Sequence, residues 1–384
     1  MTRRRIAILG STGSIGQNTL KVVRHCRPAF EVKALTAYNN IALLEKDIRE
    51  FRPEIVAVAK AHLPALRSRW KTVRFMDVDE DLDALVGRRD VDIVVLAMTG
   101  SAALGPFLAA VRAGKTVAPA NKEALVMAGE IIMEEARRCG SRIIPVDSEQ
   151  SAIFQCLEGQ RREDLKRVIL TASGGPLKDI PVKKHHTISV EDVLKHPRWC
   201  MGAKITVDSA TLMNKGFEVI EAQRLFGLSV HEVDVVVHPQ AIIHSMVEFC
   251  DGSVLAQMGV ADMCVPIQYA LTYPRRHKGA RESLDLTTAR ICTFEKPDMV
   301  KFPSLKLAYM VAGKGGTLPA VLNAADEVAV EAFLKGQIKF TTMFKIVEKT
   351  VLAHRNGSAK NIKEILAADG WARIKAREAL RKAA

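Results

Sequence analysis

The sequence lacks the patterns that mark several large classes of protein. Its seven cysteines are scattered and never spaced C-x-x-C, so they predict neither a disulfide framework nor a zinc site, and we expect reduced, mostly buried thiols. No apolar run is long enough to span a bilayer. The apolar stretch after Arg3-Arg4-Arg5 ends at once in a glycine turn, which is unlike a signal or transit peptide. We therefore expect a cytoplasmic protein that does not bind a membrane.

Aromatic residues make up only 5% of the chain, so platforms on which bases could stack are scarce. The basic residues behind the net charge of +13 are spread along the whole chain, whereas nucleic-acid-binding proteins usually concentrate them. This pattern predicts no nucleic-acid partner and a basic surface that helps to attract an anionic substrate. The 384 residues, of which 48% are hydrophobic, are typical of a globular protein with two or three domains.

A glycine-rich turn follows the first apolar strand, which we place at residues 5–10. The turn reads Gly10-Ser-Thr-Gly13-Ser-Ile-Gly16, and a helical pattern continues from it through Val23. The glycines allow a tight turn and close approach of the backbone, and the helix start offers free N–H groups. Strand, glycine turn and helix in this order predict a site for the pyrophosphate of a dinucleotide.

The second strand, predicted at residues 30–36, ends without the acidic residue that holds the ribose 2′-hydroxyl in enzymes that use NAD. The missing acid favours NADPH. The Tyr38-Asn39-Asn40 segment that follows has no basic side chain for a 2′-phosphate, although Asn39 and Asn40 can donate hydrogen bonds. NADPH is therefore preferred over NADH because of the missing acid alone.

Three further apolar strands, at 55–59, 91–97 and 116–118, alternate with helical stretches and predict a parallel sheet with both faces covered. Asn121-Lys122-Glu123 follows the last of these strands, at the edge where open parallel sheets bind ligands. Lys122 is thus either a contact with cofactor and substrate or an ordinary lysine on the surface of a helix.

Asp147-Ser148-Glu149 follows the apolar run 143–146, and we expect it at the end of a strand. Because strand side chains alternate, both carboxylates would then lie on the same side of the chain. Two converging carboxylates suit Mg²⁺ or Mn²⁺. The alternative is an exposed pair of acids that binds nothing.

Two polar stretches further along the chain could bind a phosphate group. Ser173-Gly174-Gly175 would present backbone N–H groups and a hydroxyl, although it could also be a plain turn. The stretch 204–218 could bind a phosphate by hydrogen bonds and one charge, although it could also be a capped helix with solvated ends. Its polar residues are Ser209, Asn214, Lys215 and Glu218, of which Glu218 could complete the oxygen ligands of the cation.

Trp199 and Met201 lie beside Gly202 in a predicted loop, where large apolar side chains are costly to leave in water. They either pack in the core or close over a ligand. Further on, strands are predicted at 233–237 and at 243–258 around an Asp251-Gly252 turn. Helical periodicity is found at 305–312, 322–334, 344–354 and 361–383.

These motifs together resemble the 1-deoxy-D-xylulose 5-phosphate reductoisomerase family of the non-mevalonate isoprenoid pathway. The matching stretches follow the order of the family and cover the chain from the first strand to the C-terminal helices. PVDSE and VDSATLMNKG are highly specific. The stretches are GSTGSIG, AGKTVAPANKEALV, PVDSEQSAIFQ, ASGGP, HPRWCMGAKITVDSATLMNKGFEVIEA, HPQAIIHSMVEFCDGSVLAQMG and LNAADEVAVEAFL.

The resemblance implies an α/β fold with an N-terminal Rossmann-like parallel sheet, a central α/β catalytic domain and a C-terminal α-helical bundle. The expected domains are 1–147 for NADPH, 148–292 for catalysis with a lid at about 182–206, a linker at 293–304 and the bundle at 305–384. The resemblance also implies a homodimer. With NADPH and Mg²⁺ or Mn²⁺, it would rearrange and reduce a small phosphorylated sugar, 1-deoxy-D-xylulose 5-phosphate, to 2-C-methyl-D-erythritol 4-phosphate.

Carried over residue by residue, the resemblance assigns roles to three sets of side chains. The implied metal ligands are Asp147, Glu149 and Glu218, which form the implied catalytic set together with Lys122. The implied NADPH contacts are Thr12, Gly13, Ser14, Ile15, Asn121, Glu123 and Gly202, with Asn39 and Asn40 added from their position after the second strand. The implied substrate contacts are Lys122, Ser148, Glu149, Ser173, His196, Ser209, Asn214 and Lys215, and the implied lid residues are Trp199 and Met201.

The chain departs from the family pattern in two places. Tyr38-Asn39-Asn40 stands where the family commonly has Gly-Lys/Arg/Ser-Asn, and Gln150 stands where the family usually has histidine. The rival interpretation is another NADP-dependent dehydrogenase of the semialdehyde type, which would need an activated cysteine. Cys156 lies on an apolar helical run with no histidine nearby in the sequence, so we predict an unreactive buried thiol there.

Overall fold

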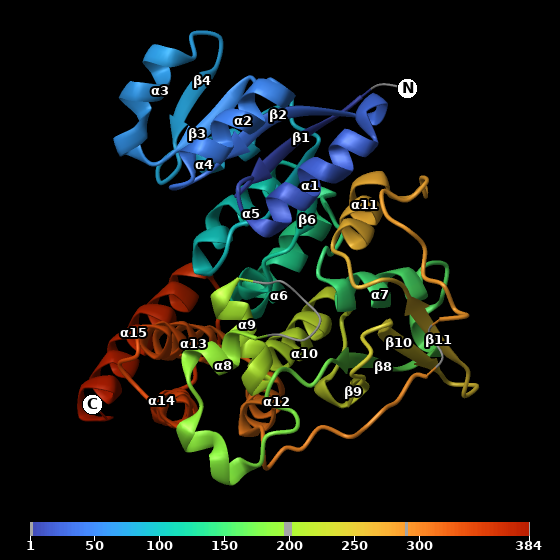
Figure 1. The fold of residues 1–384 in the computed structure, drawn as a ribbon, viewed down its shortest axis with the longest axis vertical. Helices are drawn as coiled ribbons and strands as arrows, with labels where there is room; N and C mark the ends of the chain where they lie inside the picture. The colour runs from blue at the N-terminus through green and yellow to red at the C-terminus, as the bar shows by residue number, and fades with distance from the viewer. Residues whose placement is uncertain (1–2, 196–201, 289–290, 384) are drawn as a thin grey trace. The chain divides into compact units, whose positions relative to one another are not determined.

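Two units make up the fold in the computed structural model, which describes residues 3–195, 202–288 and 291–383 (Figure 1). The first unit comprises residues 1–124, 132–151 and 262–283. The second comprises residues 125–131, 152–261 and 284–384. The chain therefore leaves the first unit and returns to it twice, and each unit is built from segments that are distant in the sequence.

The first unit contains a seven-stranded sheet with the strand order β4-β3-β2-β1-β5-β6-β7, in which every neighbouring pair is parallel (Figure 1). The predicted parallel sheet is confirmed. Strand β4 was not predicted, and the short β7 overlaps the strand expected at 143–146 by one residue. The strands are β1 (Arg4–Leu9), β2 (Phe30–Thr36), β3 (Ile55–Val58), β4 (Arg74–Asp77), β5 (Ile93–Leu96), β6 (Thr116–Pro119) and β7 (Arg142–Ile143).

The strand order reverses direction beside β1, because the chain builds β2, β3 and β4 on one side of it and β5, β6 and β7 on the other. Open α/β sheets bind their ligands at such a switch point, outside the carboxyl ends of the strands. The loops that follow β1 and β5 are therefore the expected place for a cofactor. The helices of this unit are α1 (Ser14–His25), α2 (Ile41–Phe51), α3 (Leu63–Arg69), α4 (Leu82–Val86), α5 (Leu104–Arg112) and α11 (Cys264–Thr272).

Two helices contribute residues to both units, namely α6 (Lys122–Cys139) and α7 (Ser148–Leu157). Each begins in the first unit, directly after a strand or a short extended segment. Lys122 thus lies in the first turn of α6, and the acidic triplet at 147–149 lies at the start of α7.

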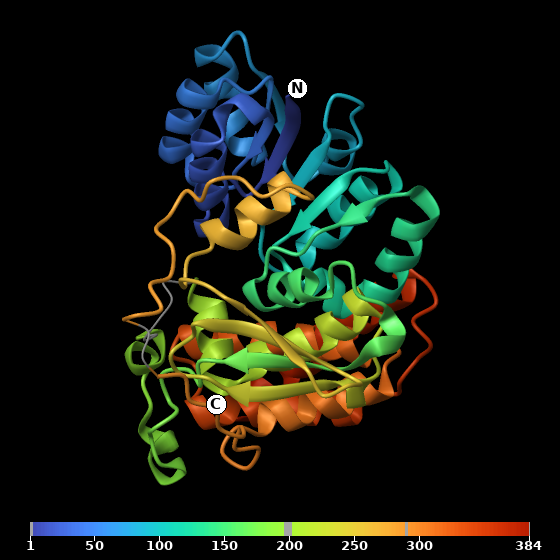
Figure 2. The same cartoon turned by 90° about the vertical axis from the view of Figure 1, so that its right-hand side faces the viewer.

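The second unit contains a four-stranded sheet with the order β11-β10-β8-β9 (Figure 2). Strands β8 and β9 are parallel, whereas β10 is antiparallel to both β8 and β11. The predicted hairpin at Asp251-Gly252 is confirmed. The strands are β8 (Leu165–Ala172), β9 (Val233–Val237), β10 (Ile243–Phe249) and β11 (Val254–Met258).

Helices of the second unit share one hydrophobic core with its sheet. Helix α10 packs against β8 and β9, and α13, buried on almost every side, packs against α14 and α15. An all-round apolar helix needs this central position. The C-terminal helical bundle is confirmed. The helices are α8 (Val190–Leu194), α9 (Ala203–Thr211), α10 (Met213–Phe226), α12 (Pro303–Lys314), α13 (Leu318–Leu334), α14 (Phe340–Ala353) and α15 (Ile362–Ala383).

Among the residues that the structure describes, no helix combines the length and apolar character that a membrane crossing requires. The six described cysteines are free thiols, but only Cys26 and Cys264 are buried. The expectation of mostly buried thiols was therefore wrong, because Cys139, Cys156 and Cys292 are half-buried and Cys250 is exposed.

Candidate active site

The glycine turn after β1 has the geometry of a pyrophosphate loop. Gly10 has a φ of +85°, and an added Cβ there would meet the carbonyl oxygen of Ala97 at 2.7 Å. The Gly10 N–H donates to the Thr36 hydroxyl at 2.8 Å, which ties the turn to the end of β2. Gly13 is the N-cap of α1 and has no side chain that could accept from the first N–H groups of the helix. Gly13 and Ser14 are exposed. The start of α1 therefore offers N–H groups to an anion.

The predicted 2′-phosphate segment after β2, residues 38–40, is exposed and contains no basic side chain. Tyr38, Asn39 and Asn40 are all exposed, and Asn40 accepts a hydrogen bond from the Leu43 N–H at 3.2 Å as the N-cap of α2. The Tyr38 hydroxyl lies 3.4 Å from a carboxylate oxygen of Asp79. The sequence analysis missed Asp79 because it missed β4, which brings this acid to the same edge of the sheet.

Asn121 joins two loops at the switch-point edge. Its side-chain oxygen accepts from the Ala124 N–H at 3.0 Å, so it caps α6. Its amide donates to the carbonyl oxygens of Met98 and Gly100, each at 3.0 Å. These bonds use the side chain for local structure, so a contact of Asn121 with a cofactor would run through its backbone. Glu123, in the first turn of α6, is half-buried.

Lys122 is not a surface lysine. Its side chain is only 6% exposed, and its Nζ lies 2.5 Å from a carboxylate oxygen of Asp147, whose side chain is 14% exposed. The alternative of an ordinary helix lysine is therefore wrong. Both groups are largely shielded from water, so each needs the other as a counter-ion. Removing either one would leave a buried charge without a partner.

The acidic triplet follows an extended segment, in which residues 144 and 146 still donate to carbonyls of β6 at 2.9 and 3.0 Å, and it also begins a helix. Strand β7 ends at Ile143, and the carbonyl of Asp147 accepts from the Ser151 N–H at 2.8 Å, which begins α7. The Ser148 hydroxyl donates to a carboxylate oxygen of Glu149 at 2.6 Å. Gln150, the departure from the family pattern, is completely buried, so its side chain belongs to the interior.

In the second unit, the Ser173-Gly174-Gly175 turn lies against the end of α9. Gly174 and Gly175 have φ values of +87° and +69°. A Cβ on Gly175 would meet the Ser209 carbonyl oxygen at 2.5 Å, so only glycine permits this approach. The Ser173 hydroxyl accepts from the Gly175 N–H at 3.3 Å. Two predicted phosphate contacts, Ser173 and Ser209, thus belong to neighbouring backbone segments.

The turn between α9 and α10 is made by Leu212, which has a φ of +58° although it is not glycine. Leu212 is the left-handed C-cap of α9, and its N–H donates to the Ser209 carbonyl. The turn places Ser209 at the end of α9 and Asn214 and Lys215 in the first turn of α10. A helix start carries partial positive charge, so this corner suits a phosphate group.

Glu218 is completely buried one turn into α10. Asn214 donates to one of its carboxylate oxygens at 2.6 Å, and the Lys215 ammonium donates to the other. Like Asp147 with Lys122, Glu218 thus has a buried lysine as its counter-ion. In the first unit, and separately in the second, a proposed metal ligand is paired with a proposed substrate-binding lysine.

Gly202, the predicted cofactor contact before the substrate region, is exposed and caps the start of α9 with its backbone. The predicted substrate contact His196 and the predicted lid residues Trp199 and Met201 lie outside the described residues. The lid, expected at about 182–206, therefore has described structure only in part, including α8 and the start of α9.

The activated cysteine that a semialdehyde-type dehydrogenase needs is not found at Cys156. Burial raises the pKa of this thiol to about 11. A nucleophilic cysteine needs the opposite shift, because the thiolate is the reactive form. The geometry of Cys156 therefore disfavours the rival interpretation.

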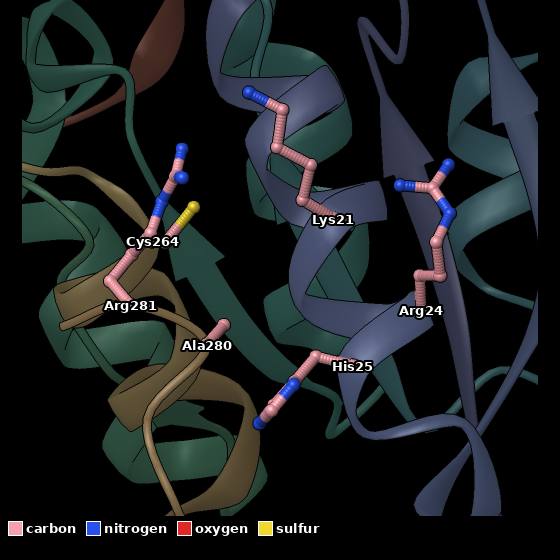
Figure 3. Close-up of a pocket in the computed structure, with 6 residues that line it drawn as sticks. All are labelled: Lys21, Arg24, His25, Cys264, Ala280 and Arg281. Atoms are coloured by element: carbon pink, nitrogen blue, oxygen red, sulfur yellow. The ribbon is translucent and has the colours of Figure 1, made fainter.

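A separate cavity of about 320 Å³ lies within the first unit, between α1 and the segment around α11 (Figure 3). Its arginines are already paired, Arg24 with Glu50 at 2.6 Å and Arg281 with Asp262 at 2.7 Å. Burial raises the pKa of its thiol, Cys264. The cavity contains none of the predicted site residues, and its lining consists of Lys21, Arg24, His25, Cys264, Ala280 and Arg281.

Comparison with known proteins gives one family along the chain. Residues 6–129 match the family model described as 1-deoxy-D-xylulose 5-phosphate reductoisomerase. Residues 143–226 match the model of the C-terminal domain of that enzyme, and residues 258–375 match a further model, the DXP reductoisomerase C-terminal domain.

Individual relatives are similar over nearly their whole length. The reductoisomerase of Geobacter metallireducens is 49% identical over 378 residues, which are 98% of either chain. The solved structure of the Zymomonas mobilis enzyme in complex with NADPH has a TM-score of 0.93 at 40% identity and covers 99% of each chain. A structure of the enzyme with NADPH, fosmidomycin and magnesium has a TM-score of 0.93 at 37% identity and covers 98% of each.

Proposed function

The chain belongs to the 1-deoxy-D-xylulose 5-phosphate reductoisomerase family, and from this premise we propose that it converts 1-deoxy-D-xylulose 5-phosphate to 2-C-methyl-D-erythritol 4-phosphate with NADPH and a divalent cation. The observation that carries the proposal is the full-length match together with a proposed ligand set of three carboxylates, two of which are held by buried lysines. The product would enter the non-mevalonate isoprenoid pathway.

The donor chemistry fits Mg²⁺ or Mn²⁺. Asp147, Glu149 and Glu218 offer hard carboxylate oxygens, which these cations prefer. Asp147 and Glu149 are half-buried and Glu218 is buried, so a cation bound by them would be poorly screened by water. When bound, the cation supplies Lewis-acid stabilisation of negative charge on the substrate oxygens.

The residues of the chain would orient the substrate and control one proton. The Lys122 ammonium has three N–H donors and lies beside the Asp147 carboxylate, so one of its N–H groups could donate to a substrate hydroxyl. Ser148, whose hydroxyl donates to Glu149, can turn to the substrate in the same way. Ser173, Ser209, Asn214 and Lys215 would hold the phosphate, and binding energy from this remote group helps to position the reacting carbons.

NADPH supplies the hydride for the reduction step. The loop from Thr12 to Ile15 would bind its pyrophosphate with N–H groups at the start of α1. Asn39 and Asn40 are exposed at the end of β2 and would donate hydrogen bonds to the 2′-phosphate. Asp79, close to Tyr38, adds negative charge there. We therefore expect a smaller preference for NADPH over NADH than a basic residue in this segment would give.

The proposed activity is tested by following NADPH oxidation with 1-deoxy-D-xylulose 5-phosphate and identifying the product by mass spectrometry. We expect turnover with Mg²⁺ or Mn²⁺ and none after EDTA, with recovery when the cation is returned. NADH in place of NADPH measures the cofactor preference in the same assay. Turnover that survives complete chelation would contradict the metal assignment, and no turnover under any condition would contradict the proposed function.

Lys215→Ala should raise KM for the substrate about ten- to hundred-fold, the range expected for loss of a charge-assisted hydrogen bond. The kcat should fall less, because the remaining contacts still hold the reacting carbons once the substrate is bound. Steady-state kinetics in saturating NADPH measure both values. Lys306→Ala, at an exposed position of α12, is the control. An unchanged KM in Lys215→Ala would remove Lys215 from the phosphate site.

We also propose that the protein is a homodimer and that β11 contributes to the contact. Strand β11 is the edge of its sheet and pairs only with β10 among the named strands. Its apolar side chains Val254, Leu255 and Met258 are between 41% and 47% exposed. An apolar edge strand with open backbone groups is an association site unless it is covered. A second copy of the chain could cover it.

Leu255→Asp should therefore convert the dimer to a monomer at micromolar concentration, because the charge would have to be buried in the contact. Sedimentation equilibrium measures the mass. Leu352→Asp is the matched control, since Leu352 is an exposed leucine on α14 and should leave the dimer intact. A dimeric Leu255→Asp protein would show that β11 lies outside the contact.

The division at residues 147, 292 and 304 and the cytoplasmic location stay predictions.

A further inference from the structure

A cluster of two buried carboxylates and one half-buried lysine connects α9 to α13. Lys204, in the first turn of α9, has its Nζ 2.6 Å from an oxygen of Asp208 and 3.0 Å from an oxygen of Asp326 on α13. Asp208 is 2% exposed and Asp326 is 4% exposed. The ammonium also lies over the Phe217 ring, 4.9 Å from its centroid. The three groups belong to one unit and form a polar contact between α9 and α13.

The charges of this cluster do not balance if both acids are ionised. Two carboxylates and one ammonium would leave a net negative charge out of water, which is costly. Burial, and then the neighbouring Asp326 carboxylate, raise the pKa of Asp208 to about 8, and burial raises the pKa of Asp326 as well. Below about pH 8 the two acids therefore share one proton, and the cluster is neutral.

In the part of the chain that the structure describes, Lys204 is the cation recorded beside both carboxylates. On α13, Glu327 follows Asp326 and is paired with Arg373 of α15 at 2.6 Å, and Arg373 also holds Asp369 at 2.7 Å. On α8, Asp192 accepts a hydrogen bond from Ser189 and Glu191 is exposed. On α10, Lys215 and Glu218 pair with each other and Glu221 is buried. On α12, Lys306 is exposed.

The cluster is adjacent to the proposed phosphate site. Ser209 follows Asp208 directly in α9, and the Ser209 carbonyl is the atom that excludes a side chain from Gly175. Leu212 then turns the chain into α10, which carries Asn214 and Lys215. Any rotation or shift of α9 on α13 would move Ser209 against the Ser173 turn. The contact that fixes α9 thus also fixes one wall of the phosphate site.

We propose that Lys204, Asp208 and Asp326 are positioning residues, which hold α9 on α13 through a shared proton and lose this hold when the proton leaves. The inference rests on the proposed function, because Ser209 must bind the substrate phosphate for the effect to reach KM. At high pH the cluster carries an uncompensated negative charge, α9 loosens at its Ser209 end, and substrate binding weakens while the bound substrate still reacts.

The test compares the wild-type protein with Asp326→Asn between pH 7.5 and 9.5, where the substrate phosphate stays fully ionised. Asparagine keeps the hydrogen bond and leaves one carboxylate for one ammonium, so no shared proton is needed. We expect the wild-type KM to rise about five-fold across this range, equivalent to about 1 kcal/mol of binding, with kcat nearly constant. The KM of Asp326→Asn should stay flat. Asp369→Asn, at a buried aspartate on α15, should keep the wild-type rise.

A second measurement is independent of activity. A carboxyl group whose pKa is raised in the folded state binds more protons there than in the unfolded chain, so stability falls as pH rises from about 4 to about 8 and is constant above. The Tm of Asp326→Asn minus the Tm of the wild type should therefore increase from about pH 4 to about pH 8 and stay constant above pH 8. If Asp326→Asn does not fold, Asp208→Asn makes the same test.

Parallel KM profiles in the wild type and Asp326→Asn would overturn the positioning role, and so would a flat wild-type KM. A Tm difference independent of pH would overturn the shared proton. If the protein turns over no 1-deoxy-D-xylulose 5-phosphate at all, the proposed function fails, but the Tm measurement still decides whether the proton is shared.

Discussion

Glu218→Gln should lower kcat by at least about a thousand-fold, because loss of the Lewis acid removes about 4 kcal/mol or more from the stabilisation of the transition state. An amide is neutral and a poor ligand for Mg²⁺ compared with a carboxylate. The substitution keeps the size of the side chain and an oxygen that can accept from Asn214, so the shape of α10 is preserved. It removes the negative charge that the buried Lys215 requires.

Three measurements separate loss of metal from loss of fold. Circular dichroism and Tm report the fold, calorimetric titration with Mg²⁺ reports the cation, and kcat reports the reaction. Glu221→Gln is the matched control, since Glu221 is a buried glutamate of the same helix that is absent from the proposed ligand set. It should bind Mg²⁺ like the wild type. Full activity of Glu218→Gln in the presence of EDTA would remove Glu218 from the metal site.

The sheet of the first unit could be predicted from the sequence because its strands are continuous apolar runs. Strand β2 was predicted with its observed bounds, β1 differs by one residue at each end, and β3 differs by one residue at its C-terminal end. Strand β4 was missed because its four residues, Arg-Phe-Met-Asp, are polar at both ends and the first of them is exposed. Missing β4 had a consequence, because β4 leads to Asp79, the acid that lies near Tyr38 at the proposed NADPH site.

The acidic triplet shows what local pattern cannot decide. An apolar run before it suggested a strand, and the named strand β7 ends at Ile143. The extended backbone continues to Val146, whose N–H still donates to the Pro119 carbonyl of β6 at 3.0 Å. The triplet then begins α7, where acidic groups are favoured by the helix dipole. The sequence pattern therefore indicated the extended segment before the triplet but not the helix that begins at Ser148.

The lysine partners of the candidate ligands could be foreseen only in one case. Lys215 is three residues from Glu218, a spacing that brings side chains together on a helix. Lys122 and Asp147 are separated by the whole of α6 and by β7, and they meet because β6 and β7 are parallel neighbours. A pairing of this kind depends on sheet topology and not on spacing, so the sequence left Lys122 with two interpretations.

Lys122→Met should destabilise the protein without a bound cation by about 3 kcal/mol, because it leaves the Asp147 carboxylate without its buried partner. Methionine keeps the apolar stem of the side chain, so packing changes little. With Mg²⁺ present, the cation takes over the charge that the ammonium balanced. The gain in Tm on adding saturating Mg²⁺ should therefore be larger in Lys122→Met than in the wild type.

The kcat of Lys122→Met should fall about a hundred-fold or more, the range expected when a group that controls proton transfer is lost. Lys115→Met is the control, because it separates the loss of the Lys122–Asp147 pair from the general effect of removing a buried lysine. Lys115 is 9% exposed and donates to the backbone carbonyls of Arg88 and Val91, so its loss also destabilises the first unit. It should leave the Tm gain with Mg²⁺ and the kcat of the folded protein unchanged. Equal Tm gains in the wild type and Lys122→Met would show that Lys122 and the cation do not compete for Asp147.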